Sequence, residues 1–190
     1  MKNEFTHPFP LNALDNVKLF VEKKVEYINS TSFAIKPLIL PSDILTTLQD
    51  ELATYGLPEI LNCVVFKRKN FPRPLINFAH IDYCQHSQEI INASIILPIS
   101  GCEGTYMYWV DGEYETRISL AAGQTTAFQQ LIWKSDYSII KETEITVPTL
   151  CRVDIPHDAH NGLNTEYRTI ASIRFKGNPS FEEILQKRFN

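Results

Sequence analysis

Hydrophobic positions near the N-terminus recur with a helical period. The apolar residues between Asn16 and residue 28 fall on one side of a 3.6-residue wheel, which predicts an amphipathic helix. A second helix is predicted after Pro41, with Ser42 as its cap and Gly56 as its stop. The two apolar stripes consist of Val17, Phe20, Val21, Val25 and Ile28 in the first helix, and of Ile44, Leu45, Leu48 and Leu52 in the second.

After the second helix the apolar residues come in short runs that are typical of strands. Asp111-Gly112 lies between two such runs and predicts a tight hairpin turn. Near the C-terminus, Ser180 and Glu183 form a capping-box pattern, which predicts a short helix over residues 180–188. Strands are predicted at residues 33–40, 63–66, 75–81, 92–99, 105–110, 124–128, 149–155 and 167–175, and in the region after Trp133.

This succession of elements predicts a mainly β fold with N-terminal helices. Its most specific interpretation is a double-stranded β-helix, the cupin-like jelly roll of two facing sheets. With 190 residues the chain suits a single domain, 1–190, around one core. Residues 1–60 are then a helical N-terminal cover, residues 61–176 the jelly-roll core and residues 177–190 a C-terminal helix.

Composition and charge narrow the range of partners. The formal net charge is −4 and the pI is about 5.7, so no nucleic acid is expected as a partner. No run approaches the roughly 20 apolar residues that span a bilayer, and the first residues lack a signal-peptide core. We therefore expect no membrane association and a cytoplasmic location. The pattern leaves the oligomeric state open.

Candidate chemistry begins with His80-Ile81-Asp82 and a distant histidine, His157. A histidine and a carboxylate two positions apart can reach one metal ion at a strand end, and a second histidine can complete three ligands on one face of the ion. Two histidines and one carboxylate suit non-haem Fe(II) oxygen chemistry. The H-x-D pattern is weak by itself. Here it ends the apolar run at 74–79, where a loop would start and functional side chains gather.

An arginine, Arg168, lies eleven positions after His157 and suggests a dicarboxylate beside the metal. Its planar fork pairs with a carboxylate through two parallel hydrogen bonds. If a loop from His157 to Tyr167 joins two antiparallel strands, Arg168 starts the returning strand close to the metal. Ser172 and Arg174 share its face by alternation, but Arg174 would lie about 20 Å farther along, at about 3.3 Å per residue.

The second half of the chain also resembles a known family. The motifs are the H-x-D, the apolar strand Ala93-Ser94-Ile95-Ile96-Leu97-Pro98, the run Gly104-Thr105-Tyr106, and a Pro-His turn followed by R-x-x-x-S-x-R-F at 168–175. In this order they resemble the Fe(II)- and 2-oxoglutarate-dependent oxygenases, particularly the small prolyl-hydroxylase-like members of phage or bacterial type. The resemblance covers about Val64 to Phe175.

The resemblance implies a dioxygenase that hydroxylates its substrate, with Fe(II) as cofactor and 2-oxoglutarate as co-substrate. His80, Asp82 and His157 would be the iron ligands, and Arg168 would bind the distal carboxylate of 2-oxoglutarate. By alternation along its strand, Ser172 shares the face of Arg168 and would add a hydroxyl to the partners of that carboxylate. The substrate is unidentified; a peptide or amino acid is favoured over another small molecule.

Other residues compete for roles at the site. His160 is a rival distal ligand, but His157 directly follows the strand and, as in the family, has an asparagine a few positions on. Asn77, Asn92, Tyr106 and His160 are possible pocket residues, and the tyrosine and the two asparagines have structural interpretations as well.

Two other functions remain open at this stage. One is a cupin-like metal enzyme that uses no 2-oxoglutarate. The other is a non-enzymatic jelly-roll binding or structural module, in which each of the four key residues is an ordinary core, turn or surface residue. Against the second stands the cost of leaving two histidines and a carboxylate together without a metal.

Overall fold

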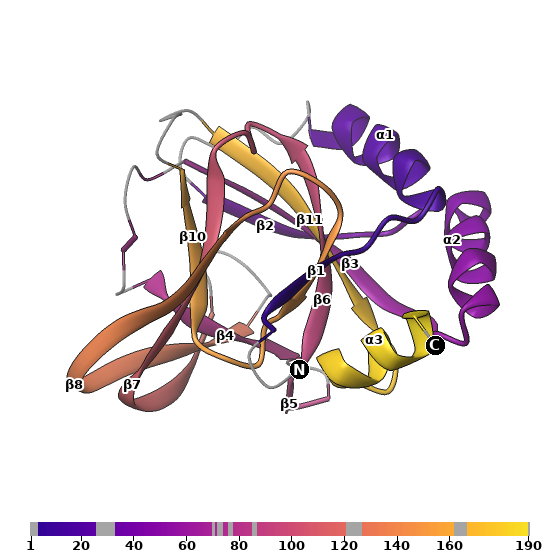
Figure 1. Cartoon of the computed structure of the whole chain (residues 1–190). Coiled ribbons are helices and arrows are strands. Elements are labelled where there is room, and N and C mark those ends of the chain that lie inside the picture. The colour runs from indigo at the N-terminus through magenta and orange to yellow at the C-terminus, as the bar shows by residue number, and fades with distance from the viewer. Residues whose placement is uncertain are drawn as a thin grey trace.

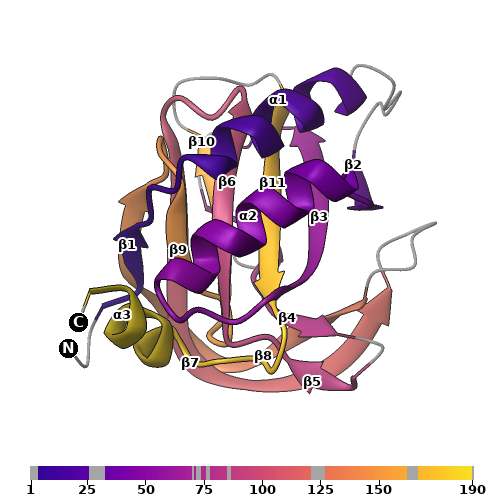
Figure 2. The same cartoon turned by 90° about the vertical axis from the view of Figure 1, so that its right-hand side faces the viewer.

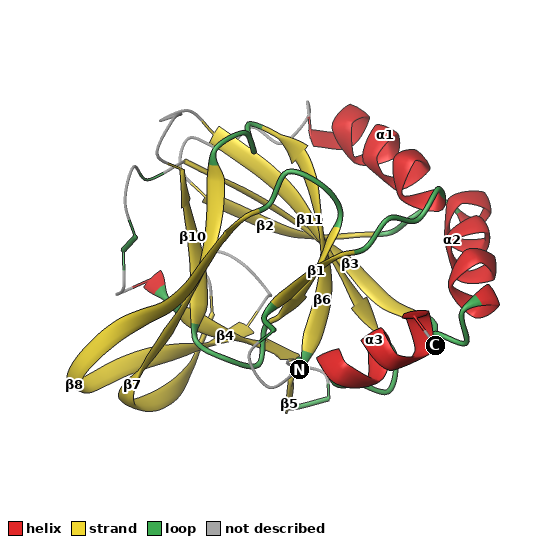
Figure 3. Ribbon diagram, in the orientation of Figure 1, coloured by secondary structure: helices red, strands yellow, loops and turns green. Residues whose placement is uncertain are grey.

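The computed structural model describes residues 4–25, 33–69, 71, 74–75, 78–84, 87–120, 127–161 and 167–189. Strands predominate among these residues, and helices lie near both ends of the chain (Figure 3). The mainly β class expected from the sequence is confirmed.

One sheet has six strands, and all its pairings are antiparallel. In spatial order they are β1 (Thr6–Pro8), β9 (Thr149–Arg152), β6 (Ala93–Ser100), β11 (Tyr167–Phe175), β3 (Ile60–Lys69) and β2 (Phe33–Leu38). Alternation gives β11 two different faces. Ala171, Ile173 and Phe175 pack into the core beneath the helices, whereas Ile170 packs toward the second sheet.

The second sheet has five strands. They are β10 (His157–Asn161), β7 (Thr105–Leu120), β8 (Ala127–Glu144), β4 (His80–Cys84) and β5 (Glu89–Ile90). Because β10 also pairs with β4, the strands β10, β7, β8 and β4 close on one another. The long β7–β8 hairpin projects away from the rest of the molecule (Figure 1).

Three helices are described: α1 (Ala13–Val25), α2 (Ser42–Thr54) and α3 (Phe181–Phe189). The first two lie across the outer face of the six-stranded sheet (Figure 2), as their apolar stripes require. Ser42 is not the cap of α2, because Pro41 occupies that position and no side chain caps the helix. The predicted C-terminal helix is confirmed, with Ser180 Oγ accepting the Glu183 N–H and Glu183 Oε2 accepting the Ser180 N–H. Ile28 lies outside the described residues.

The predicted turn at Asp111-Gly112 is wrong. Both residues lie inside β7, where the register with β8 shifts just after Gly112. A Cβ atom at Gly112 would come within 3.1 Å of the Asp136 carbonyl oxygen and of the Trp133 ring. The glycine therefore permits a close approach of the two strands instead of reversing the chain.

Two expectations about the site's local structure are also wrong. His80 begins β4 rather than ending a strand over 75–81, and just before it Phe78 N–H donates to the Leu75 carbonyl oxygen. His157 begins β10, which lies in a different sheet from β11. The strand that starts near Arg168 therefore pairs with β3 and β6, not with the strand of His157.

The two sheets face each other across an interior packed with apolar side chains from both. Ile96, Cys151 and Ile170 of the six-stranded sheet lie in one cluster with Met107 and Trp109 of β7. Phe128 of β8 packs against Ile35 and Val64 of the first sheet, as Phe66 of β3 does. Two of the candidate metal ligands lie beside these clusters, since the His80 ring is near that of Phe128 and His157 pairs in register with Trp109. No helix in the described part of the chain is long and apolar enough to cross a bilayer.

Candidate metal centre

The structure brings His80, Asp82 and His157 together. One ligand atom from each lies within 4.8 Å of the others, and no other residue of the described part joins the group. His80 Nε2 lies 3.6 Å and His157 Nε2 lies 3.9 Å from Asp82 Oδ1. These separations are too long for direct hydrogen bonds. The three atoms therefore face a common point without bonding one another.

The two histidine rings are held in the same way. His80 Nδ1–H donates to the Phe78 carbonyl oxygen at 3.0 Å, and His157 Nδ1–H donates to the Ile155 carbonyl oxygen at 2.8 Å. A carbonyl oxygen only accepts, so both hydrogen bonds place the proton on Nδ1. The lone pair of each ring is then on Nε2, the atom that faces Asp82. Metal-binding histidines are commonly oriented by such a bond at the other ring nitrogen.

Arg174 binds and orients Asp82, the third candidate ligand. Its Nη2 donates to Asp82 Oδ2 at 2.8 Å, and both side chains are almost fully buried. The sequence interpretation placed Arg174 about 20 Å beyond the metal end, so this contact was missed. The face of Arg174 was right by alternation, but β11 packs against the second sheet in such a way that the long side chain reaches Asp82. With Oδ2 engaged, Oδ1 is the oxygen left for a metal.

The protonation states suit metal binding. Burial and the neighbouring His80 lower the pKa of His157 to about 4, so this ring is neutral at pH 7. Burial alone would raise the pKa of Asp82, but Arg174 and the two histidines outweigh it and the pKa is lowered. A neutral imidazole and an ionised carboxylate are the forms that bind metals.

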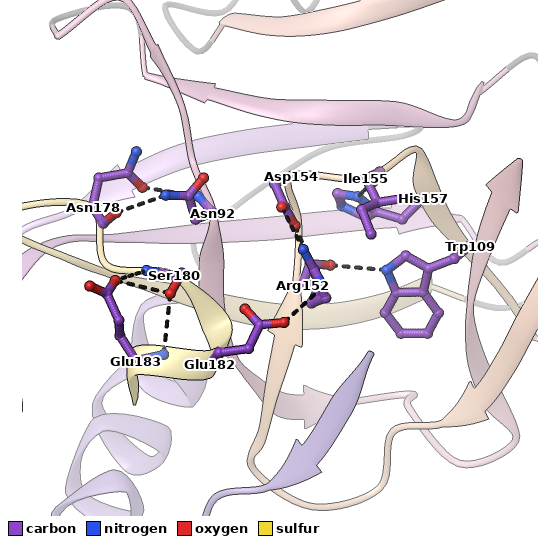
Figure 4. A network of polar contacts seen from close by, with 10 residues as sticks. All are labelled: Asn92, Trp109, Arg152, Asp154, Ile155, His157, Asn178, Ser180, Glu182 and Glu183. Carbon is purple, nitrogen blue, oxygen red and sulfur yellow. Dashed lines mark hydrogen bonds and ion pairs between the residues drawn. The ribbon is translucent and has the colours of Figure 1, made fainter. Parts of the chain in front are cut away.

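Backbone hydrogen bonds tie the segment before His157 to its surroundings. Asp82 N–H donates to the Val153 carbonyl oxygen, and Val110 N–H donates to the Pro156 carbonyl oxygen. Figure 4 shows the side chains that support this segment. Trp109 Nε1–H donates to the Arg152 carbonyl oxygen, and the Arg152 guanidinium pairs with Asp154 and Glu182. The candidate ligands thus lie on β4 and β10, and these hydrogen bonds and ion pairs stabilise the segment that leads into β10.

A second cationic group lies at the start of β11. Arg168 pairs in register with Arg68 of β3 and is 8% exposed. Arg68 already forms an ion pair with Asp158 at 2.7 Å. Within the described residues, the Arg168 guanidinium forms no hydrogen bond or ion pair. Burial and the nearby Arg68 lower its pKa to about 10, which leaves it charged at neutral pH.

Unsatisfied polar atoms line the inner face between this arginine and the triad. Ser172 shares the face of Arg168 and Arg174 by alternation, and its Oγ is buried without a hydrogen-bond partner. Arg174 pairs in register with Asn62 and Ser94. Asn62 Oδ1, Ser94 Oγ and Arg174 Nε are buried and unpartnered as well. Native interiors seldom leave such atoms alone, so this face is suited to a polar ligand or ordered water.

The remaining predicted pocket residues lie apart from the triad or cannot be placed. His160 Nε2 pairs with Glu142 at 3.1 Å, and its ring stacks on that of Tyr106, which is partly exposed. Asn92 bonds through its backbone N–H and side-chain amide to Asn178. Asn77 lies outside the described residues.

Comparison with known proteins adds little. No family model and no curated protein matches the sequence. Among solved structures the chain is similar to the X-ray structure of E. coli ycfD, with a TM-score of 0.37 and 14% identity over 76% of this chain and 33% of that one. The chain thus spans about a third of that protein. A similarity at this level leaves function to be argued from the site.

Proposed function

We propose that this protein is an Fe(II)- and 2-oxoglutarate-dependent dioxygenase that hydroxylates a peptide or small-molecule substrate. The observation that carries the proposal is the convergence of His80 Nε2, Asp82 Oδ1 and His157 Nε2 on one point, with the pKa values of Asp82 and His157 both lowered toward the forms that bind a metal. Two histidines and one carboxylate on one face are the ligand set of non-haem Fe(II) oxygenases.

The strand order supports a double-stranded β-helix as the scaffold. Two antiparallel sheets face each other, and from β3 to β11 the chain passes back and forth between them, with β4–β5 and β7–β8 as consecutive pairs within the second sheet. This alternation is what a jelly roll requires. The candidate ligands come from β4 and β10, two strands that pair with each other, which favours a rigid site.

Arg168 supports 2-oxoglutarate as the co-substrate. The Arg168 guanidinium is buried beside Arg68, and Asp158 compensates the two arginines only in part, so a second carboxylate would neutralise the remaining charge through paired hydrogen bonds. Ser172 Oγ offers a further donor on the same face. A dicarboxylate that reaches both the metal and Arg168 accounts for two features, the triad and the unpaired arginine, that otherwise destabilise the interior.

The chain's own residues have distinct roles in this proposal. Bound iron with 2-oxoglutarate supplies the oxidising power for a C–H bond. Arg174 fixes Asp82 so that Oδ1 faces the metal, and the Phe78 and Ile155 carbonyl oxygens fix the two imidazoles. The apolar clusters on both sides of the triad keep water away from the reaction.

The location and partners proposed here follow the sequence. The four cysteines are free and buried, which is compatible with a reducing cytoplasm. The acidic net charge disfavours nucleic acid as the substrate.

The test is iron content together with conversion of 2-oxoglutarate to succinate in air. Wild-type protein should bind one Fe(II) per chain and form succinate. Asp82→Asn should lose both properties, whereas His160→Gln, a change at the rival histidine, should keep the iron. Iron without conversion of 2-oxoglutarate would favour a metal enzyme that uses another co-substrate. No bound iron would favour a non-enzymatic module.

A further inference from the structure

A row of side chains crosses the second sheet from the candidate metal centre toward solvent. In register, His157 pairs with His80, His80 with Gln130, and Gln130 with Arg117. Cross-strand partners project from the same face, so the four side chains form one line. The exposed fraction rises from 7% for the His157 side chain to 22% for that of His80, and Arg117 is exposed. Gln130 belongs to β8 and Arg117 to β7, the two strands of the long hairpin labelled in Figure 1.

The outer end of the row is held in one orientation. Arg117 Nε and Nη2 both donate to Gln130 Oε1, at 2.9 and 2.8 Å. Among the described residues, neither Arg117 Nη1 nor the amide nitrogen of Gln130 forms a hydrogen bond. An arginine that is already ordered loses less conformational freedom when it binds a ligand.

Arg117 is also electrostatically unpaired. Within the described residues its guanidinium contacts no carboxylate, although acids lie close by on the same hairpin. Lys134 of the hairpin, by contrast, forms an ion pair with Glu115 at 2.8 Å. Elsewhere Lys176 pairs with Glu59, and Arg152 pairs with Asp154 and Glu182. A fixed and unneutralised guanidinium in line with the metal ligands is suited to an anionic group.

We propose that Arg117, oriented by Gln130, binds a carboxylate of the substrate, and that the substrate is an acidic peptide. This inference rests on the proposed oxygenase function, since it treats the triad as the reacting centre. Two strand spacings put Arg117 about 10 Å from His80, and an extended peptide advances about 3.3 Å per residue. The acidic residue therefore lies about three positions from the residue that is oxidised.

The surroundings favour a peptide over a nucleic acid. Arg117 is a single cation, and the hairpin around it carries more acids than bases: Asp111, Glu113, Glu115, Asp136, Glu142 and Glu144 against Arg117, Lys134 and Lys141. Such a surface repels a chain of phosphates but accepts one carboxylate. Ile132, the next residue on the Gln130 face of β8, is 45% exposed and offers an apolar contact to a peptide.

The test is affinity selection from a defined peptide pool by the immobilised full-length protein, with Fe(II) and 2-oxoglutarate, in the absence of oxygen. The probes are N-acetylated, C-amidated heptapeptides with a varied central residue and with Glu, Gln or Lys three positions away. Mass spectrometry reads the ratio of captured Glu to Gln members. We expect about tenfold enrichment of Glu members, the effect of one charge-assisted contact.

Three variants test whether Arg117 is responsible. Arg117→Gln should bring the ratio of Glu to Gln members to about one, and Arg117→Glu should favour the Lys members. Lys134→Gln is the matched control on the same hairpin, and it should keep the wild-type ratio because Glu115 already neutralises Lys134. Thermal midpoints verify that each variant is folded.

Distinct results would overturn the inference. A wild-type ratio near one, or an unchanged ratio in Arg117→Gln, removes the role of Arg117. If an oligothymidylate of eight nucleotides displaces the peptides, and does so only when Arg117 is present, the ligand of this site is a nucleic acid and not a peptide.

Succinate formation is measured separately. Acid preference without conversion of 2-oxoglutarate contradicts the oxygenase but keeps the peptide site, and conversion without acid preference contradicts only the inference.

Discussion

Replacing Arg168 with methionine should stabilise the metal-free protein. Arg168 is 8% exposed and pairs in register with Arg68, and its guanidinium has no hydrogen-bond or ion-pair partner in the described part of the chain. Methionine keeps an unbranched stem for packing and removes the charge. The same change should abolish any stabilisation by 2-oxoglutarate, because it removes the group that is proposed to bind the distal carboxylate.

The magnitude follows from the pKa of Arg168, which burial and Arg68 lower from 12.5 to about 10. A lowered pKa for a cation means that folding disfavours its charged form. At neutral pH the group is charged in both states, so the full penalty is present. At about 1.4 kcal/mol per tenfold change in proton affinity, it amounts to about 3 kcal/mol. Because methionine recovers only part of the packing of the stem, we expect a gain of about 1 to 3 kcal/mol.

The assay is urea unfolding at pH 7.5 with a chelator present, repeated with metal and 2-oxoglutarate. Wild-type protein should gain about 2.7 kcal/mol at a 2-oxoglutarate concentration of 100 times Kd, and Arg168→Met should gain nothing from it. A loss of more than about 1 kcal/mol in metal-free Arg168→Met would refute the reasoning. It would mean that the charge is already satisfied, and the observation that supports a co-substrate would be lost.

Other predictions concern the remaining parts of the site. Arg174→Met is the same change on the same face of β11, but it should destabilise the protein. It should lower the free energy of unfolding in urea by about 3 to 5 kcal/mol, because it leaves the Asp82 carboxylate buried and unpaired. A loss below about 1 kcal/mol would contradict this. The pKa of His157 is about 4 in the folded protein, so between pH 6.5 and 4 this histidine binds a proton more readily in the unfolded chain. The free energy of unfolding of the metal-free protein should therefore fall by about 3 kcal/mol as pH drops through this range. His157→Phe should lack this fall, and an identical pH profile would refute the assignment. Gly101→Ala should weaken 2-oxoglutarate binding, measured by calorimetry, because a Cβ there would lie 2.2 Å from the Tyr167 carbonyl oxygen, beside Arg168; unchanged affinity would contradict it.

The triad could be found from the sequence because its features are local. An H-x-D pattern puts both side chains on one face of a strand, and the Pro-His pair marks His157 just after another predicted strand, although His157 in fact begins β10. The structure brings His80, Asp82 and His157 together as the spacing suggested. The alternation of β11 likewise identified the face that Arg168 and Arg174 share.

What the sequence missed depends on how distant strands pack. Arg174 reaches Asp82 only because β11 faces the second sheet across the interior, and no spacing along β11 encodes that contact. Asp111-Gly112 favours a turn locally, but pairing with β8 continues through it. The line from His80 through Gln130 to Arg117 joins three strands, so it becomes visible only once their register is known.

The most direct test of the central claim is an anaerobic titration of the Fe(II)-loaded protein with 2-oxoglutarate, followed by visible absorption. The account predicts a saturable charge-transfer band at one iron per chain. The band should be absent in His157→Ala, and it should need much more 2-oxoglutarate in Arg168→Met. If wild-type protein binds no iron and shows no band, the triad is not an iron site and the proposed function is wrong.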